Sequence, residues 1–425
     1  MEPLTSPKAS SAPSIAPSDQ PLAVALAGMA ALAAAMGIGR FAFTPLLPMM
    51  LHDGVVDIAT GSWLATANYA GYLAGALLYM ALPWLGRRLG AGAAPGNATL
   101  VRGGLVATVL LTGLLALPWP ASWPLLRLLA GVASALVFLG TANWCMGRLA
   151  HLRRPALGGL IFCGPGLGIV FTGLPASAMV AAGWTAASGW AAFAVLAAAL
   201  CAGGWRVFQG GETPAPAPAG RPHAAALPPA AHPVAERTLL AVAYGLAGLG
   251  YIVTATFLPV IARAALPAGS AWPDLFWPIF GAGVALGALL STRIAPTRDR
   301  RKLLAVAYLL QAGAIALPLL WPGRAGFALG SLLLGLPFTA ITFFALQEAR
   351  HQWPQAGAGF TGLMTALYGI GQIAGPPMAA ALLARAGSQA QGFGWALGVA
   401  GAVLVMGAVI YGLMAWHWRA VHQIK

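Results

Sequence analysis

Charged side chains are scarce in this chain of 425 residues. Aspartate and glutamate together number 9, lysine and arginine 23, and all charged residues make up 8% of the sequence. Soluble globular proteins carry roughly 25% charged residues. With 59% hydrophobic residues, this shortage excludes a water-soluble fold.

Cysteine is equally rare, and sites for metals and catalysis are not evident. Cys145, Cys163 and Cys201 all lie within apolar runs, so they predict no disulfide framework and no metal site. The seven histidines lie mainly in loops without metal-ligand spacing, and no catalytic motif is present. We therefore expect a protein that is not an enzyme and holds no cofactor.

Long apolar runs dominate instead. A membrane-spanning helix needs roughly 20 apolar residues. Twelve runs qualify, at approximately 22–50, 62–85, 98–117, 123–146, 156–181, 184–207, 238–262, 275–294, 303–320, 325–346, 358–383 and 392–416. The sequence predicts an all-α integral membrane protein with twelve transmembrane helices.

Polar segments divide these runs into two sets of six. Residues 1–21 are rich in Ser, Pro and Ala and predict a disordered cytoplasmic tail, and residues 419–425 a second cytoplasmic tail. Residues 210–237, rich in Pro and Ala, cannot bury enough apolar surface to fold and predict a cytoplasmic linker. The linker separates an N-terminal six-helix bundle, 22–209, from a C-terminal one, 238–418.

The net charge of +14 is an orientation signal rather than a sign of nucleic-acid binding. With a cytoplasmic N-terminus, 18 of the 23 basic residues lie in cytoplasmic segments and three lie outside: Arg263, Arg324 and Arg385. Arg40 and Arg127 lie within spans. By the positive-inside rule we expect both termini in the cytoplasm. We also expect a multi-pass monomer in the cytoplasmic (inner) membrane.

The two halves also align with each other. Residues 37–48 match 248–259 at an offset of 211, which places Arg40 opposite Tyr251. Two shorter matches follow in order: Gly75–Leu78 with Gly287–Leu290 at 212, and Gly164-Pro165 with Gly375-Pro376 at 211. Three matches at nearly one offset predict two pseudo-symmetric halves in a parallel repeat.

A six-plus-six parallel repeat with a central cytoplasmic loop resembles the major facilitator superfamily over nearly all twelve spans. Several segments resemble its uncharacterised YbfB/YjiJ-type branch: GIGRFAFTPLLPMM at 37–50, RLLAGVASALVFLGTAN at 127–143, YGLAGLGYIVTATFLPVIAR at 244–263, LQEAR at 346–350 and GLMTALYGIGQIAGP at 362–376. The resemblance implies a secondary transporter that binds its substrate near the midplane, but it does not fix the substrate.

Arg40 is the sharpest feature within the spans. An arginine near a helix centre costs about 2.5–3.5 kcal/mol, so it should face a partner or an aqueous cavity. If both halves present the same face to that cavity, Arg40 and Tyr251 meet a substrate from opposite sides. The alternative is that Arg40 bonds backbone carbonyls where Gly39, Pro45 and Pro48 disturb the helix, or that its side chain extends outward to the membrane surface. Further substrate-binding candidates are Asn143, Tyr368 and Gln372.

We expect coupling or gating residues inside the fourth span and at the external edge of the eighth. Arg127 in Arg-x-x-x-Gly131 resembles a fourth-helix pattern of proton-coupled members, which implies a part in proton transfer or gating. Without that resemblance, Arg127 would be a structural residue that reaches the headgroups from near the helix end. Asp274, at the external edge of the eighth span, could form a salt bridge that opens on protonation, or could simply favour a helix N-terminus. We expect Glu348 to pair with a neighbouring basic residue in 347–350.

The cytoplasmic loops and the Gly-Pro pairs resemble further superfamily patterns. The loop after the second span has Arg87 and Arg88 but no aspartate, whereas Asp299 follows the eighth span among arginines; both loops are candidates for gating. Gly164-Pro165 resembles an antiporter motif, and Gly375-Pro376 is its counterpart. Small residues and prolines of this kind also serve helix packing alone.

The sequence thus predicts a secondary active transporter that moves a small anionic organic solute by alternating access, with proton coupling left open. Two arginines lie in the spans with no acid deep in the membrane to neutralise them, which favours an anion. Proton-driven efflux of hydrophobic or cationic compounds is the alternative. The expected partners are a small-molecule substrate, protons and the lipid bilayer.

Overall fold

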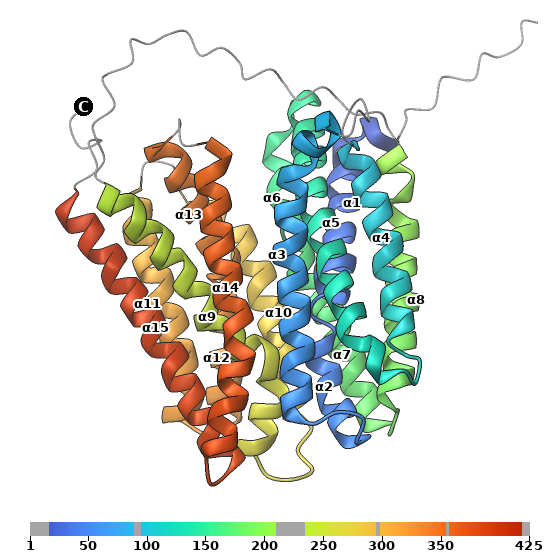
Figure 1. Ribbon diagram of the computed structural model, residues 1–425, viewed down its shortest axis with the longest axis vertical. Helices are drawn as coiled ribbons and strands as arrows, with labels where there is room; N and C mark the ends of the chain where they lie inside the picture. Colours follow the sequence, from blue (N-terminus) through green and yellow to red (C-terminus); the bar gives the residue numbers. More distant parts are fainter. Residues whose placement is uncertain (1–16, 89–94, 210–233, 295–297, 354–356, 419–425) are drawn as a thin grey trace, which may run out of the picture.

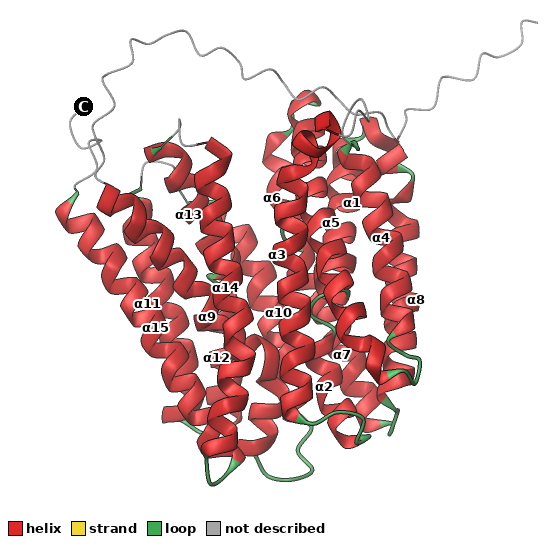
Figure 2. Cartoon of the chain, viewed as in Figure 1, coloured by secondary structure: helices red, strands yellow, loops and turns green. Residues whose placement is uncertain are grey.

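The computed structural model describes residues 17–88, 95–209, 234–294, 298–353 and 357–418. Helices joined by short loops make up these residues, and no strand is found among them (Figure 2). The described part of the chain is therefore all-α.

The described residues of the first half form eight α-helices and a π-helix. They are α1 (Pro21–Leu32), the π-helix η2 (Ala33–Ile38), α2 (Phe43–His52), α3 (Ile58–Arg88), α4 (Asn97–Leu114), α5 (Trp123–His151), α6 (Gly158–Ile161), α7 (Gly164–Ala181) and α8 (Ala186–Trp205). Single 3-10 turns lie at Pro17–Asp19, Pro120–Ser122, Pro155–Leu157 and Val207–Gln209. The first and fifth spans are each interrupted.

Seven helices are formed by the part of the second half that the structure describes. They are α9 (Val234–Ala265), α10 (Trp272–Ser291), α11 (Arg300–Leu320), α12 (Arg324–Gly335), α13 (Phe338–Gln352), α14 (Gly357–Arg385) and α15 (Gln389–His417). The tenth span is interrupted between α12 and α13, at Leu336 and Pro337.

Eleven helical stretches of the described residues are long and apolar enough to cross a membrane. They correspond to eleven of the twelve predicted spans. The remaining one, α3, is 31 residues long and runs alongside the others (Figure 1). It carries Asn68, Tyr69 and Tyr72 in its interior, and these polar and aromatic side chains contribute to the candidate site described below.

The helices form two groups (Figure 1). Helices α1 to α8 lie in one group and α9 to α15 in the other. Contact between the groups is made chiefly by α7 with α10, by α3 with α14, and by α2 with α9. Elements from both halves of the sequence therefore meet along one interface.

Glycines of the sequence repeat occupy equivalent packing positions in the two halves. A side chain at Gly75 of α3 would collide with the Val132 carbonyl of α5, and one at Gly287 of α10 with the Leu336 carbonyl just before α13. Second and fourth spans thus pack as the eighth and tenth do. Small residues permit this close backbone approach.

Two helices begin before their predicted spans, within the predicted tail and the predicted linker. Helix α1 begins at Pro21, and the turn Pro17–Asp19 before it lies against the bundle, where Arg148 pairs with Asp19. Helix α9 begins at Val234, within the predicted linker. The rest of the predicted tails and linker, 1–16, 210–233 and 419–425, lies outside the described residues.

Candidate binding site

The backbone of the first span breaks beside Arg40. The π-helix ends at Ile38, residues 39–42 form turns, and α2 starts at Phe43. Arg127 of α5 reaches this break: its Nη1 donates to the Gly39 carbonyl and its Nη2 to the Arg40 carbonyl, each over 3.3 Å. Interrupted helices in a membrane need such partners for their freed backbone groups.

Arg127 is only 1% exposed and lies 4.8 Å from the centre of the Phe43 ring. Asn68 of α3 supports it by donating to the Arg127 carbonyl over 2.9 Å. The alternative role predicted for Arg40 was to bond backbone carbonyls at a disturbed helix. In the structure it is Arg127 that makes these bonds. Arg127 positions the segment that carries Arg40.

The Arg40 side chain points across the interface between the two halves and is 2% exposed. Its Nη2 donates to Oε1 of Gln372 on α14 over 2.7 Å, and Gln372 Nε2 donates to the Tyr251 hydroxyl on α9 over 2.5 Å. Three residues predicted to bind substrate are therefore linked by hydrogen bonds.

The guanidinium of Arg40 is neutralised by no carboxylate in the described part of the chain. Its Nε and Nη1 find no hydrogen-bond partner among the residues that the structure describes. The rings of Tyr72 and Tyr69 lie 4.1 and 5.0 Å from the guanidinium carbon. Aromatic rings stabilise a buried cation by roughly 0.5–2 kcal/mol, so Arg40 keeps unused capacity to bind an anion.

Tyrosines continue from this cluster toward the side predicted to be cytoplasmic. Tyr368 of α14 stacks on Tyr251 with ring centres 6.0 Å apart, and on Tyr244 at 4.8 Å. Tyr244 donates to Thr342 of α13 over 3.3 Å. Tyr72 and Tyr368 are only half-buried. The fourth predicted residue, Tyr368, thus adjoins the linked three.

The opposite, predicted external side is closed by contacts between α2, α3 and α9. Thr44 donates to the Ala255 carbonyl over 2.7 Å, and the hydroxyls of Tyr69 and Thr256 lie 2.9 Å apart. All residues of 33–50 and 251–262 are buried. The cluster is therefore more tightly sealed on the external side than toward the half-buried tyrosines.

Asn143, predicted to bind substrate, does not join the cluster. It is an exposed residue near the other end of α5 and donates to the Tyr79 hydroxyl over 2.7 Å, which in turn donates to Asn97. Asn143 lies about four helical turns beyond Arg127 along α5, too far along the helix to reach the Arg40 cluster. Hydropathy does not reveal this difference in depth.

Asp274 pairs within its own half. Its carboxylate lies 2.5 Å from Nη2 of Arg263, at the adjacent ends of α9 and α10, and the residue is 7% exposed. No ion pair joins it to Arg40 or Arg127 among the described residues.

A buried charge cluster occupies the predicted cytoplasmic end of the second half. Arg301 of α11 lies 3.0 Å from Glu236, 3.3 Å from Asp299 and 3.7 Å from Glu348. Arg300 also contacts Glu348, over 3.4 Å. The expected pairing of Glu348 with a basic residue of 347–350 is therefore corrected: its ion-pair partners come from α11. Glu236, assigned to the linker, is completely buried in α9.

Arg87 and Arg88, after the second predicted span, belong to no comparable cluster among the described residues. Arg87 and Arg88 are exposed at the end of α3, and Arg88 lies over the Trp84 ring at 5.1 Å. Neither takes part in an ion pair within the described residues. In the described residues, the two halves therefore differ in the ion pairs at their predicted cytoplasmic ends.

The Gly-Pro pairs lie at close helix contacts. A side chain at Gly164 would collide with the Met29 carbonyl, and one at Gly375 with Ile252. Pro165 lies in the first turn of α7, after the break in the fifth span, whereas Pro376 lies inside the continuous helix α14. Their backbone roles differ although their sequences align.

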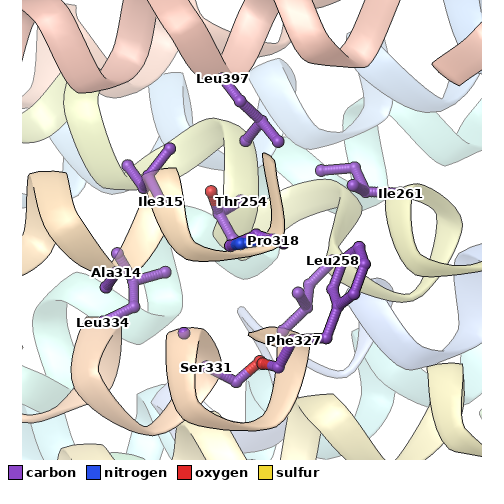
Figure 3. Close-up of a pocket in the computed structure, with 11 residues that line it drawn as sticks. Thr254, Leu258, Ile261, Ala314, Ile315, Pro318, Phe327, Ser331, Leu334 and Leu397 are labelled. Carbon is purple, nitrogen blue, oxygen red and sulfur yellow. The ribbon is translucent and has the colours of Figure 1, made fainter. Parts of the chain in front are cut away.

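A small cavity inside the second half is unsuited to a substrate. Thr254 and Ser331 are the polar side chains among its otherwise apolar lining (Figure 3). Its volume is about 10 Å³, and a single water needs roughly 10–15 Å³ by this measure. The candidate site is therefore the Arg40 cluster rather than this cavity.

Comparison with known proteins gives a family and a fold. Residues 32–412 match the family described as uncharacterised MFS-type transporter YbfB. None of the curated proteins compared with the chain matches it. A crystal structure of a variant of the nucleoside transporter NupG has the same fold, with a TM-score of 0.65 and 14% identity, over 92% of this chain and 98% of that one.

Proposed function

Because this chain belongs to the YbfB-type family of major facilitator superfamily (MFS) transporters, we propose that it carries a small organic anion across the membrane and that Arg40 binds the anionic group. The family makes the chain a secondary transporter. The observation that carries the anionic substrate is the Arg40 guanidinium, which is 2% exposed, faces no carboxylate in the described residues and has two unpartnered nitrogens.

Gln372 holds the place of the substrate when the carrier is empty. Its amide oxygen accepts from Arg40 Nη2 over 2.7 Å. A carboxylate is a stronger acceptor than an amide and can bond two guanidinium nitrogens at once. The substrate therefore displaces Gln372 from Arg40, and the Tyr251 hydroxyl and the Tyr368 ring complete its surroundings.

Displacement of Gln372 also loosens the interface. Arg40 belongs to the first half, whereas Gln372 and Tyr251 belong to the second, so their hydrogen bonds tie the halves together. With the Thr44 and Tyr69 contacts, they close the external side. Substrate binding removes one of these ties, which favours rocking of the halves about the midplane and hence alternating access.

Proton coupling is assigned to the Asp274–Arg263 pair. The carboxylate is 7% exposed and pairs between α9 and α10, so its protonation would release Arg263. Arg127 serves as a positioning residue for Arg40. At the other end, the cluster around Asp299 and Arg301 holds α9, α11 and α13 together and gates the cytoplasmic side.

Efflux of cationic compounds is the weaker alternative. A cation in the site would face Arg40 without a carboxylate from the described residues to offset the repulsion. An anion, in contrast, is attracted by Arg40 and needs no further charged group in the site. A cationic dye therefore serves as the comparison substrate.

Transport into proteoliposomes tests the proposal. Wild type, Arg40→Ala and Arg40→Lys are compared on a panel of organic anions, with a neutral nucleoside and a cationic dye beside them. We expect the wild type to take up at least one anion, Arg40→Lys to take it up more weakly, and Arg40→Ala not to take it up. Arg324→Ala, which removes an exposed arginine outside the site, is the matched control and should behave as wild type.

Unchanged anion uptake by folded Arg40→Ala would refute the role of Arg40. Uptake of the dye alone by the wild type would favour efflux of cations. Collapse of the pH gradient tests coupling separately: it should stop accumulation in the wild type, and Asp274→Asn should lose accumulation but keep exchange.

A further inference from the structure

A second cavity lies where α10, α11 and α13 meet, at the ends predicted to face the cytoplasm. Its volume is about 170 Å³, many times the roughly 10–15 Å³ that a single water needs by the same measure. Ser291, Thr292, Arg298, Arg300, Phe343 and Gln347 are among the residues that line it. None of them belongs to the Arg40 cluster.

Two arginines make this cavity basic. Arg298 is exposed, and no ion pair involving it is found in the part of the chain that the structure describes. Arg300 is held in place at the wall: its Nε donates to Gln347 over 3.2 Å, and its Nη1 donates to Glu348 over 3.4 Å. A fixed guanidinium and a free one thus border the same space.

The nearby acids do not fill the cavity. Glu348 divides its charge between Arg300 and Arg301, at 3.4 and 3.7 Å. Glu236 and Asp299 pair with Arg301, and neither lines the cavity. A phosphate group, which arginine binds well because its planar fork matches the oxygens, would supply the missing negative charge.

The rim of the cavity is apolar and outward-facing. Ile294 and Phe343 line it and are 37% and 43% exposed. Basic pockets between transmembrane helices on the cytoplasmic side bind anionic lipid headgroups, because the headgroup meets the arginines while the acyl chains stay in the bilayer. The cavity combines both features: arginines in its lining and exposed apolar residues beside them.

We propose that this cavity binds a phosphate-bearing anion between Arg298 and Arg300, and that the anion is the headgroup of an anionic phospholipid. Arg300 also contacts Glu348, which belongs to the buried cluster joining α9, α11 and α13. Bound phosphate therefore strengthens the packing of this end of the second half.

Lipid titration of the purified full-length protein in detergent tests this proposal. The ligands are dioctanoyl phosphatidylglycerol, dioctanoyl phosphatidylcholine and inorganic phosphate; binding is measured by native mass spectrometry and by the rise in melting temperature. Wild type should bind phosphatidylglycerol in preference to phosphatidylcholine. Arg298→Gln should bind it about fivefold more weakly, the effect of one basic residue near an anionic surface.

Arg385→Gln is the matched control, because Arg385 is exposed at the opposite end of the helices. It should bind as wild type. Stabilisation by inorganic phosphate that competes with the lipid would keep the phosphate site but assign it to a free anion, which overturns the lipid part. Equal binding of both lipids, or equal affinity of the Arg298 and Arg385 variants, would overturn the site itself. Because these readouts measure binding and not transport, they are independent of the role of Arg40.

Discussion

Gln372 accepts a hydrogen bond from Arg40 in the empty site. Its substitution by glutamate should place a carboxylate there that competes with the substrate for Arg40. The new carboxylate would stand where the amide oxygen now accepts from Arg40 Nη2 over 2.7 Å. Gln372→Glu therefore pairs Arg40 internally. We expect weaker anion binding together with an undiminished melting temperature, because a buried unpaired cation gains a partner.

The size of the effect follows from the distance. At 2.7 Å and an effective dielectric of about 20, two unit charges attract by about 6 kcal/mol. Burial of the new carboxylate offsets several kcal/mol of this attraction. A net gain of about 1.5–3 kcal/mol, typical of a hydrogen bond to a charged group, corresponds to roughly 10- to 150-fold weaker substrate binding.

The assay is anion uptake by proteoliposomes as a function of substrate concentration, with melting temperature measured on the same preparations. Gln391→Glu is the matched control, because Gln391 is exposed and its side-chain oxygen also accepts a hydrogen bond, from the Gly387 amide. It should leave KM unchanged. If Gln372→Glu transports the anion with wild-type KM, the reasoning is refuted.

Three further substitutions test the surroundings of Arg40. Tyr251→Phe removes the acceptor of Gln372 and one polar group of the site, and should raise KM about 2- to 10-fold; an unchanged KM would exclude the hydroxyl from the site. Arg127→Met leaves the Gly39 and Arg40 carbonyls without this donor and should lower the melting temperature and the anion affinity together; a loss of affinity alone would mean a direct role in binding. Glu236→Gln breaks the buried pair with Arg301 and should cost about 3–5 kcal/mol of stability, measured by thermal unfolding in detergent, with KM for any folded fraction unchanged.

Much of the fold could be predicted because a bilayer imposes simple rules. A spanning helix needs roughly 20 apolar residues, and the runs in the sequence mark eleven helical stretches and α3. The form of the breaks within spans could not be predicted. Gly39, Pro45 and Pro48 indicated a disturbed helix in the first span, but the sequence does not specify a π-helix at 33–38 followed by turns at 39–42.

The candidate site was partly predictable for the same reason. A buried arginine is costly and therefore conspicuous, and the repeat offset of 211 placed Tyr251 opposite Arg40. Which polar residues meet across helices depends on depth and rotation, which hydropathy does not fix. Gln372 accordingly joins Arg40, whereas Asn143 lies far along α5 and Glu348 pairs with α11.

Direct binding to Arg40 is the central claim, and calorimetric titration of the transported anion into purified protein tests it most directly. The account predicts measurable binding by the wild type and by Arg324→Ala. It also predicts at least roughly tenfold weaker binding by Arg40→Lys, which keeps the charge but loses the planar fork, and none by folded Arg40→Ala. Equal Kd values for wild type and Arg40→Ala would contradict it.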